Sequence, residues 1–139
     1  MYSGFDSQGA IVEERLTEVH LRYILAIYEI SQSMPDVSSA SVADRLGVRK
    51  PTVSAMIAGL SDKNLVVKRR YGKIYLTEQG LVIARRMAMN IDYLMKKFAI
   101  LDMPLNKEEM YRAAKAAAIA LPETDFRGLR KQTFVSNGS

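Results

Sequence analysis

Several residue types are absent or scarce in this 139-residue chain, and each absence narrows its possible functions. The sequence has no cysteine, no tryptophan and a single histidine, His20. Without cysteine there can be no disulfide bond and no thiolate metal site. One histidine leaves no histidine–carboxylate cluster at metal-binding spacing, and no Ser-His-Asp set, glycine-rich phosphate loop or pair of catalytic carboxylates stands out. An enzyme is therefore not expected.

Long apolar runs and a targeting pattern are missing as well. No apolar stretch approaches the roughly 20 residues that span a bilayer. The first ten residues contain glycine, serine and aspartate but not the charged-then-apolar pattern of a signal peptide. With 48% hydrophobic and 25% charged residues, the composition suits an ordinary soluble core. We expect a cytoplasmic protein of one domain, or of one small domain with an appendage.

The segment from Ser39 to Leu60 has the spacing of a helix-turn-helix. Ala43 is small enough for a second helix to cross closely over the first. Gly47 lies where the turn requires a positive φ, which glycine adopts at little cost. The second helix of such a unit typically lies in the major groove of DNA. Six apolar residues supply the predicted shared core: Val42, Leu46, Val48, Val53, Met56 and Leu60.

Helical periodicity also precedes this unit, over about residues 16–31. Apolar residues form two stripes there, so this helix is either central to its own domain or shared with a partner. One stripe contains Leu16, Val19, Tyr23, Ile27 and Ile30, and the other contains Leu21, Ile24, Leu25 and Tyr28.

The remaining elements follow from caps, turns and β-branched runs. Ser38 or Ser39 caps a helix over 41–46, and the third helix begins near Pro51. Two β-branched runs within 65–76 flank a basic tip and predict a hairpin, which directly after a recognition helix is a wing. A long helix over 77–101 and a final helix over 106–121 complete the chain.

The expected fold is mainly α with a small β-hairpin: a winged helix-turn-helix domain plus a C-terminal helical dimerisation region. The expected boundaries are a flexible N-terminus at 1–13, the DNA-binding domain at 14–76, the dimerisation region at 77–130 and a flexible tail at 131–139.

Positive charge is concentrated in one stretch of the chain. Nine basic residues lie between Arg49 and Arg86 against two acidic ones, which gives +7 there and −2 in the rest of a chain of net charge +5. A solvated charged face is the ordinary explanation of such a cluster. Because this one overlaps the helix-turn-helix and its wing, contact with DNA phosphates is the preferred interpretation.

Polar side chains opposite the apolar stripe of the third helix are the candidates for base contacts. Arginine and lysine can donate to guanine O6 and N7, and hydroxyls suit phosphates or base edges. Serines that open the preceding helix could hold a phosphate or simply cap the helix. The wing could reach DNA, or could be only a solubilising turn. The predicted DNA-binding residues are Ser39, Ser41, Arg49, Lys50, Pro51, Thr52, Ser54, Arg69, Arg70 and Lys73.

A run of alanines in the last helix lets another helix approach closely. Two-fold operators need two copies of a helix-turn-helix, so we expect a homodimer on double-stranded DNA. The predicted dimerisation residues are Ala113, Ala117, Ala118 and Leu121, together with the second stripe of the first helix.

The order of these parts resembles the diphtheria-toxin-repressor and manganese-transport-regulator family over about residues 14–130. The resemblance rests on the first-helix sequence at 23–30, on 41–48 followed by the Pro-Thr-Val-Ser motif at 51–54, and on the wing-to-helix junction at 76–80. It implies a dimeric winged-helix transcription regulator, usually a repressor.

The metal ligands of that family do not carry over. In the alignment that the resemblance implies, the ligand positions fall on Arg22, Leu25, Ile91, Lys115, Ala118 and Ile119. None of these side chains binds a divalent ion usefully. The two cations could replace the charge of the ion, although ordinary surface charge is the preferred interpretation.

We therefore expect no cofactor. One alternative is a repressor that senses manganese or iron through other ligands, for which Glu18, His20, Asp92, Glu108 and Glu109 are the candidates. A second alternative is a dimeric protein-interaction module that no longer binds an operator. The operator sequence, the effector and the sign of regulation are not encoded in any recognisable motif.

Overall fold

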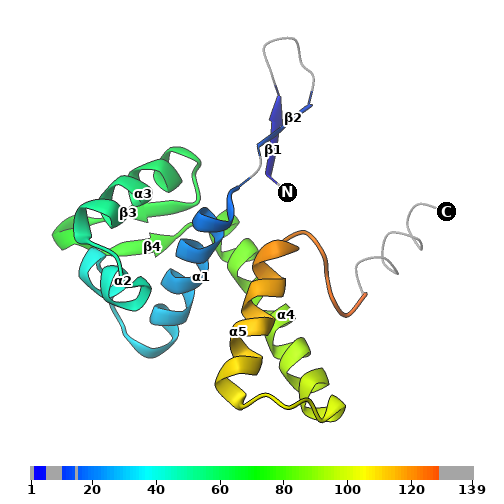
Figure 1. The fold of residues 1–139 in the computed structure, drawn as a ribbon. Coiled ribbons are helices and arrows are strands. Elements are labelled where there is room, and N and C mark those ends of the chain that lie inside the picture. The colour runs from blue at the N-terminus through cyan, green and yellow to red at the C-terminus, as the bar shows by residue number, and fades with distance from the viewer. Residues whose placement is uncertain (1, 6–10, 15, 129–139) are drawn as a thin grey trace. The chain divides into compact units, whose positions relative to one another are not determined.

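The structure of the protein is a computed structural model that describes residues 2–5, 11–14 and 16–128 (Figure 1). The chain divides into two compact units, Met1–Ala84 and Arg85–Ser139. The predicted tail at 131–139 lies outside the described residues. No helix in the described part of the chain is both long and apolar enough to cross a membrane.

The first unit starts with an antiparallel pair of strands, β1 (Tyr2–Phe5) and β2 (Ile11–Glu14). These strands lie within residues 1–13 and at Glu14, where the sequence predicts a flexible N-terminus over 1–13. Both ends of that segment contain aromatic or β-branched residues, which favour strands.

Helix α1 (Glu18–Ser33) is the central helix of the first unit. Both of its predicted apolar stripes are buried within the single chain, apart from Val19, which is 41% exposed, and Tyr28, which is half-buried. The second stripe includes Leu21, Ile24 and Leu25, each at most 1% exposed. The helix is apolar on two sides because it is central to its own domain, and not because it is shared with a partner. The second stripe is consequently not available to a second copy.

The single histidine closes the N-terminus of α1. The Thr17 hydroxyl accepts the backbone N–H of His20, and Nδ1 of His20 accepts the backbone N–H of Thr17, both at 3.1 Å. Burial, and then the charge of Lys63, lower the pKa of His20, which favours the neutral ring that this acceptor role requires. His20 therefore has a structural role as a cap.

Helices α2 (Ser39–Leu46) and α3 (Lys50–Asp62) form the predicted helix-turn-helix. Gly47 ends α2 with φ of 67°, so the predicted positive φ is confirmed. The turn then closes through a hydrogen bond from the Val48 N–H to the Ala43 carbonyl at 3.0 Å. Ala43 is only 8% exposed, as expected for a small residue at a close crossing.

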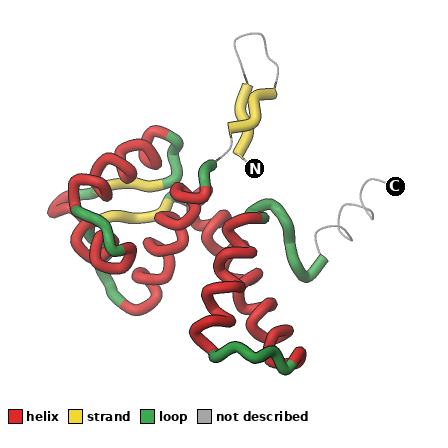
Figure 2. Tube along the Cα trace, viewed as in Figure 1, coloured by secondary structure: helices red, strands yellow, loops and turns green. Residues whose placement is uncertain are grey.

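The wing is the antiparallel hairpin of β3 (Val66–Lys68) and β4 (Ile74–Leu76), with a short 3₁₀ turn, Arg70–Gly72, at its tip (Figure 2). The end of β4 next to this turn is attached to the segment between α1 and α2. The Ile74 N–H donates to the Val37 carbonyl at 2.9 Å, and Ser38 pairs with Lys73 as a β-bridge. The wing is thus fixed to the residues that begin α2.

Helix α4 (Glu78–Leu101) starts where the wing ends. The Thr77 hydroxyl accepts the N–H of Gly80 at 3.1 Å and so caps α4, and it donates to the Asn64 carbonyl at 2.7 Å. Gly80 packs directly against the backbone of Leu65, the residue before β3. A Cβ at position 80 would overlap the carbonyl oxygen of Leu65. Glycine is therefore needed here for close approach rather than for an unusual φ.

The second unit contains the rest of α4 and helix α5 (Lys107–Ala120), which Asn106 caps together with Glu109. Its one buried polar side chain among the described residues is Asn90, at 1% exposure. Asn90 donates to the Thr124 carbonyl at 2.7 Å and accepts the Phe126 N–H at 3.0 Å. This side chain ties the segment after α5 to α4. An asparagine within a helix gave no sign of that role in the sequence.

Candidate nucleic-acid interface

The polar face of α3 is exposed as predicted. Val53, Ile57 and Leu60 are at most 1% exposed and point into the first unit. Met56, which was expected in the core, is half-buried. The five candidates on this helix and its cap are all exposed: Arg49, Lys50, Pro51, Thr52 and Ser54. Arg49 is the N-cap residue and makes no side-chain cap, so its guanidinium is not needed to begin the helix.

The two candidate serines of α2 have different surroundings. The Ser41 hydroxyl accepts the Ser38 N–H at 2.9 Å and donates to the Ser38 carbonyl at 2.9 Å. It is therefore committed to the capping box of α2 and cannot at the same time donate to a phosphate. Ser39 is half-buried in the first turn of the same helix.

The three DNA-binding candidates on the wing also differ in their surroundings. Arg69 and Arg70 are exposed, and among the described residues neither side chain forms an ion pair. Lys73 instead pairs with Asp36 across 3.2 Å. Lys73 directly follows the tip turn, so this ion pair helps to hold the tip end of β4.

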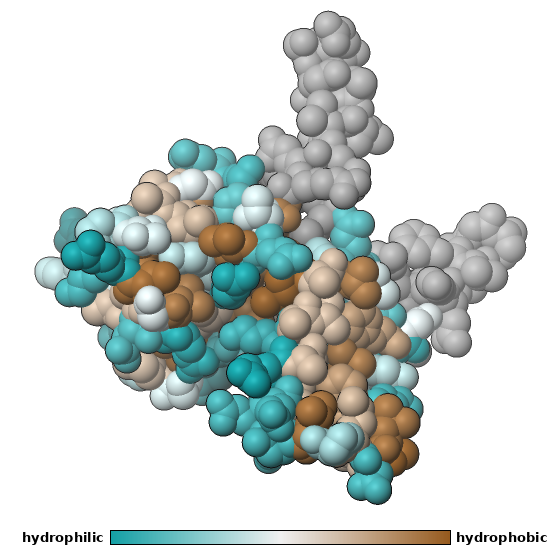
Figure 3. Space-filling view, in the orientation of Figure 1, coloured by the Kyte–Doolittle hydropathy of each residue, from teal (hydrophilic) through white to brown (hydrophobic). Residues whose placement is uncertain are grey.

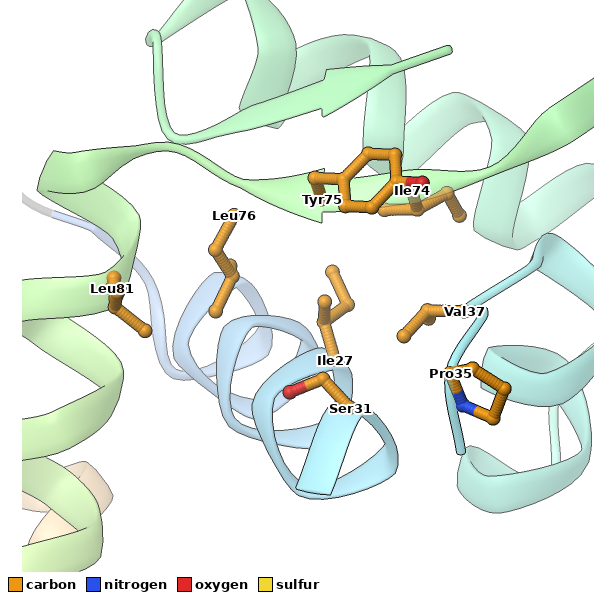
Figure 4. A pocket seen from close by; sticks show the side chains of 8 residues that line it. All are labelled: Ile27, Ser31, Pro35, Val37, Ile74, Tyr75, Leu76 and Leu81. Atoms are coloured by element: carbon orange, nitrogen blue, oxygen red, sulfur yellow. The ribbon is translucent and has the colours of Figure 1, made fainter. Parts of the chain in front are cut away.

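A half-open pocket of about 190 Å³ lies between α1, the segment before α2, β4 and the start of α4 (Figure 4). Ile27 and Ser31 enter it from α1, and Ile74 and Leu76 from β4. Its lining contains no charged side chain and no histidine. The pocket is therefore not a site for an anion or a metal ion.

The predicted dimerisation residues are not equally available. Ala113 and Leu121 are exposed and Ala117 is half-buried, but Ala118 is fully buried in the single chain. Ala118 must accordingly be removed from the predicted interface, because its surface is already covered.

The second unit also exposes larger apolar side chains, which are not among the predicted dimerisation residues. Tan and brown side chains gather over α4 and α5 on the face drawn in Figure 3. The most exposed large ones around the end of α4 are Ile100 at 75%, Leu101 at 64% and Met103 at 38%. Their position at the end of the long helix predicted over 77–101 is the signal in the sequence that could have identified them.

The residues at the family's metal positions do not fit a divalent ion. Arg22 is exposed and cationic, and Lys115 is half-buried beside the Tyr111 ring, with its Nζ 6.0 Å from the ring centroid. The other four are apolar and buried, at 6% exposure or less: Leu25, Ile91, Ala118 and Ile119. They offer neither lone pairs nor negative charge. No group of three or more histidine, cysteine or acidic residues suited to a metal occurs within the described residues.

Comparison with known proteins agrees with this architecture. Residues 15–74 match the family described as the iron-dependent repressor, N-terminal DNA-binding domain. The comparison with curated proteins found no match.

Several solved structures share the fold. The metal-dependent transcriptional regulator MtsR is 24% identical with a TM-score of 0.59, over 70% of this chain and 45% of that one. The manganese regulator SloR is 22% identical with a TM-score of 0.63, over 86% and 54%. The T. acidophilum protein IdeR is 18% identical with a TM-score of 0.54, over 92% and 56%. The chain thus spans about half the length of these proteins.

The helix-turn-helix followed by the β3–β4 hairpin defines a winged-helix protein. Its residues 15–74 match the family of iron-dependent repressor DNA-binding domains, in agreement with the resemblance to the diphtheria-toxin-repressor and manganese-transport-regulator family. That resemblance is confirmed for this domain, and the fold class is confirmed with it.

Proposed function

We propose that this protein is a homodimeric, sequence-specific DNA-binding transcription regulator, acting as a repressor, whose DNA binding does not depend on a metal ion. The observation that carries the proposal is the exposed polar start of α3 beside a basic wing, within a domain that matches a repressor DNA-binding family. Proteins of this architecture insert the second helix of the helix-turn-helix into the major groove.

Each part of the interface has a separate task in this proposal. Arg49 and Lys50 reach base edges, because both are exposed at the end of α3 that enters the groove. Thr52 and Ser54 contribute hydroxyls to bases or phosphates. Arg69 and Arg70 on the wing bind phosphates and add affinity that does not depend on sequence. Binding to genomic fragments in a gel shift, at several salt concentrations, tests DNA binding itself, and failure to bind would favour a protein-interaction module.

Neutralising the wing should make DNA binding less sensitive to salt. Each phosphate contact contributes roughly 0.9 to the slope of log affinity against log salt concentration. The double variant Arg69→Gln/Arg70→Gln should therefore have a slope shallower by about 1.8 per bound protomer. The control Lys96→Gln/Lys97→Gln removes the same charge from α4 and should leave the slope unchanged. Equal slopes for the wing variant and the wild type would mean that the wing faces away from DNA.

The dimer is proposed to form through the second unit. A two-fold operator is bound by two helix-turn-helix units about one helical turn apart, and exposed apolar side chains on α4 and α5 supply the surface. Sedimentation equilibrium at micromolar concentration should give the mass of a dimer. Ile100→Glu/Leu101→Glu should give a monomer, whereas the control Met34→Glu, on the first unit, should not. A wild-type protein that stays monomeric both alone and on DNA would refute the proposal.

Metal independence is proposed from the side chains at the family's ligand positions, which are cationic or apolar. The similar structures include a metal-dependent transcriptional regulator, MtsR, and a manganese regulator, SloR. For the present chain, DNA affinity and melting temperature should be the same with excess Mn²⁺, with Fe²⁺ and with chelator, because a ligand stabilises only a state that binds it. A higher melting temperature together with tighter DNA binding on adding Mn²⁺ would instead favour the alternative acidic and histidine ligand set.

A further inference from the structure

The tip of the wing holds a tyrosine in an unusual position. Tyr71 is 93% exposed, the highest exposure among the large hydrophobic residues that the structure describes. Its backbone has φ of 62° and ψ of 24°, which is the left-handed region. Two other non-glycine residues of the described chain have positive φ, and both belong to the types that tolerate it, Asn64 and Asp102. A bulky tyrosine adopts a positive φ much less readily.

The fold gives no reason for a tyrosine at this position. Its side chain is almost fully exposed, so it buries little apolar surface that could offset the unfavourable backbone conformation. A glycine or asparagine would form the same turn with less strain, and Gly72, which follows, already has φ of 73°. An exposed aromatic residue with an unfavourable backbone conformation therefore suggests a functional role.

The surroundings indicate which ligand this tyrosine meets. Arg69 and Arg70 precede it and are exposed, so the tip is basic. The tip end of β4, directly after the turn, is held by the Lys73–Asp36 ion pair at 3.2 Å and by the hydrogen bond from the Ile74 N–H to the Val37 carbonyl at 2.9 Å. Tyr71 therefore projects from an anchored, positively charged hairpin that follows the recognition helix in the chain.

We propose that Tyr71 inserts into the minor groove beside the half-site bound by α3 and makes the wing select A·T base pairs there. This inference rests on the proposed function. The phenol ring offers an apolar body for the sugar walls, and its hydroxyl donates to the A N3 or T O2 acceptors on the groove floor. In G·C pairs the guanine amino group adds a donor that projects from the groove floor, so it obstructs a donating hydroxyl that approaches the floor. Phosphate contact alone would need only the two arginines.

The test compares stability and DNA binding in the same variants, with duplexes selected from a random library by the wild-type protein. Tyr71→Gly removes both the ring and the strain, so its melting temperature should equal or exceed that of the wild type while its DNA affinity falls about three- to tenfold. The control Asn64→Gly changes a left-handed residue at the opposite end of the wing from its tip and should leave affinity unchanged. Tyr71→Phe keeps the ring and loses the donor.

The base pairs flanking the half-site provide the second readout. Wild-type protein should prefer A·T over G·C pairs there, and Tyr71→Phe should lose most of that preference while keeping its specificity inside the half-site. Wild-type affinity and flank preference in Tyr71→Gly would overturn this inference alone and leave the proposed function intact. A wild-type protein that selects no duplex would overturn both.

Discussion

Replacing Gly80 with alanine is expected to destabilise the winged-helix unit by about 1–3 kcal/mol, the usual cost of overpacking a well-filled site. The added Cβ would overlap the carbonyl oxygen of Leu65. That oxygen also accepts the Thr77 N–H at 3.0 Å, so it cannot move away without breaking a hydrogen bond at the start of α4. The collision is with backbone, which is less able to yield than a flexible side chain.

Helix propensity alone predicts the opposite sign, because alanine is favoured over glycine inside a helix by about 1 kcal/mol. Gly59 of α3 separates the two effects. A Cβ at Gly59 meets nothing within 4 Å, so Gly59→Ala should stabilise the protein by about 0.5–1 kcal/mol. Urea unfolding followed by circular dichroism measures both variants. A Gly80→Ala protein as stable as Gly59→Ala would show that α4 does not pack closely on the start of the wing.

Most of the fold could be predicted because its signals are local. Gly47 fixes the turn through its backbone freedom, Thr77 and Ser38 cap helices through their own hydroxyls, and the period of the apolar residues reveals the buried face of α3. The exposed candidates on α3 follow from the same periodicity, since the face opposite a buried stripe must meet solvent.

The features that were missed depend on contacts between distant parts of the chain. Asn90 becomes important only because the segment around Thr124 returns to α4. In the sequence, Lys73 belongs to the positive charge of the wing. In the structure it forms an ion pair with Asp36, which lies before α2 in the chain. Ala118 looks like its neighbours in an alanine-rich helix, and only the packed structure distinguishes the buried face from the exposed one.

Removing the first two basic side chains of the recognition helix should have the largest effect on DNA recognition. A side chain that makes a bidentate contact with a base contributes about 1–3 kcal/mol of discrimination, so Arg49→Ala and Lys50→Ala should each weaken binding to the selected duplex by about 5- to 150-fold. Folding should be unaffected, because both side chains are exposed and Arg49 makes no side-chain cap. Fluorescence anisotropy titrations against the selected duplex and against random DNA measure the effect.

The comparison between the two DNAs decides what each side chain contacts. If Arg49 reads a base, its loss should weaken binding to the selected duplex much more than binding to random DNA and should relax preference at one base pair, because phosphate contacts contribute equally to both. Lys107 is a matched control, since it is the exposed first residue of α5 as Lys50 is of α3. Lys107→Ala should bind like the wild type. An equal loss on both DNAs would assign these side chains to phosphates, and no loss on either would remove α3 from the interface.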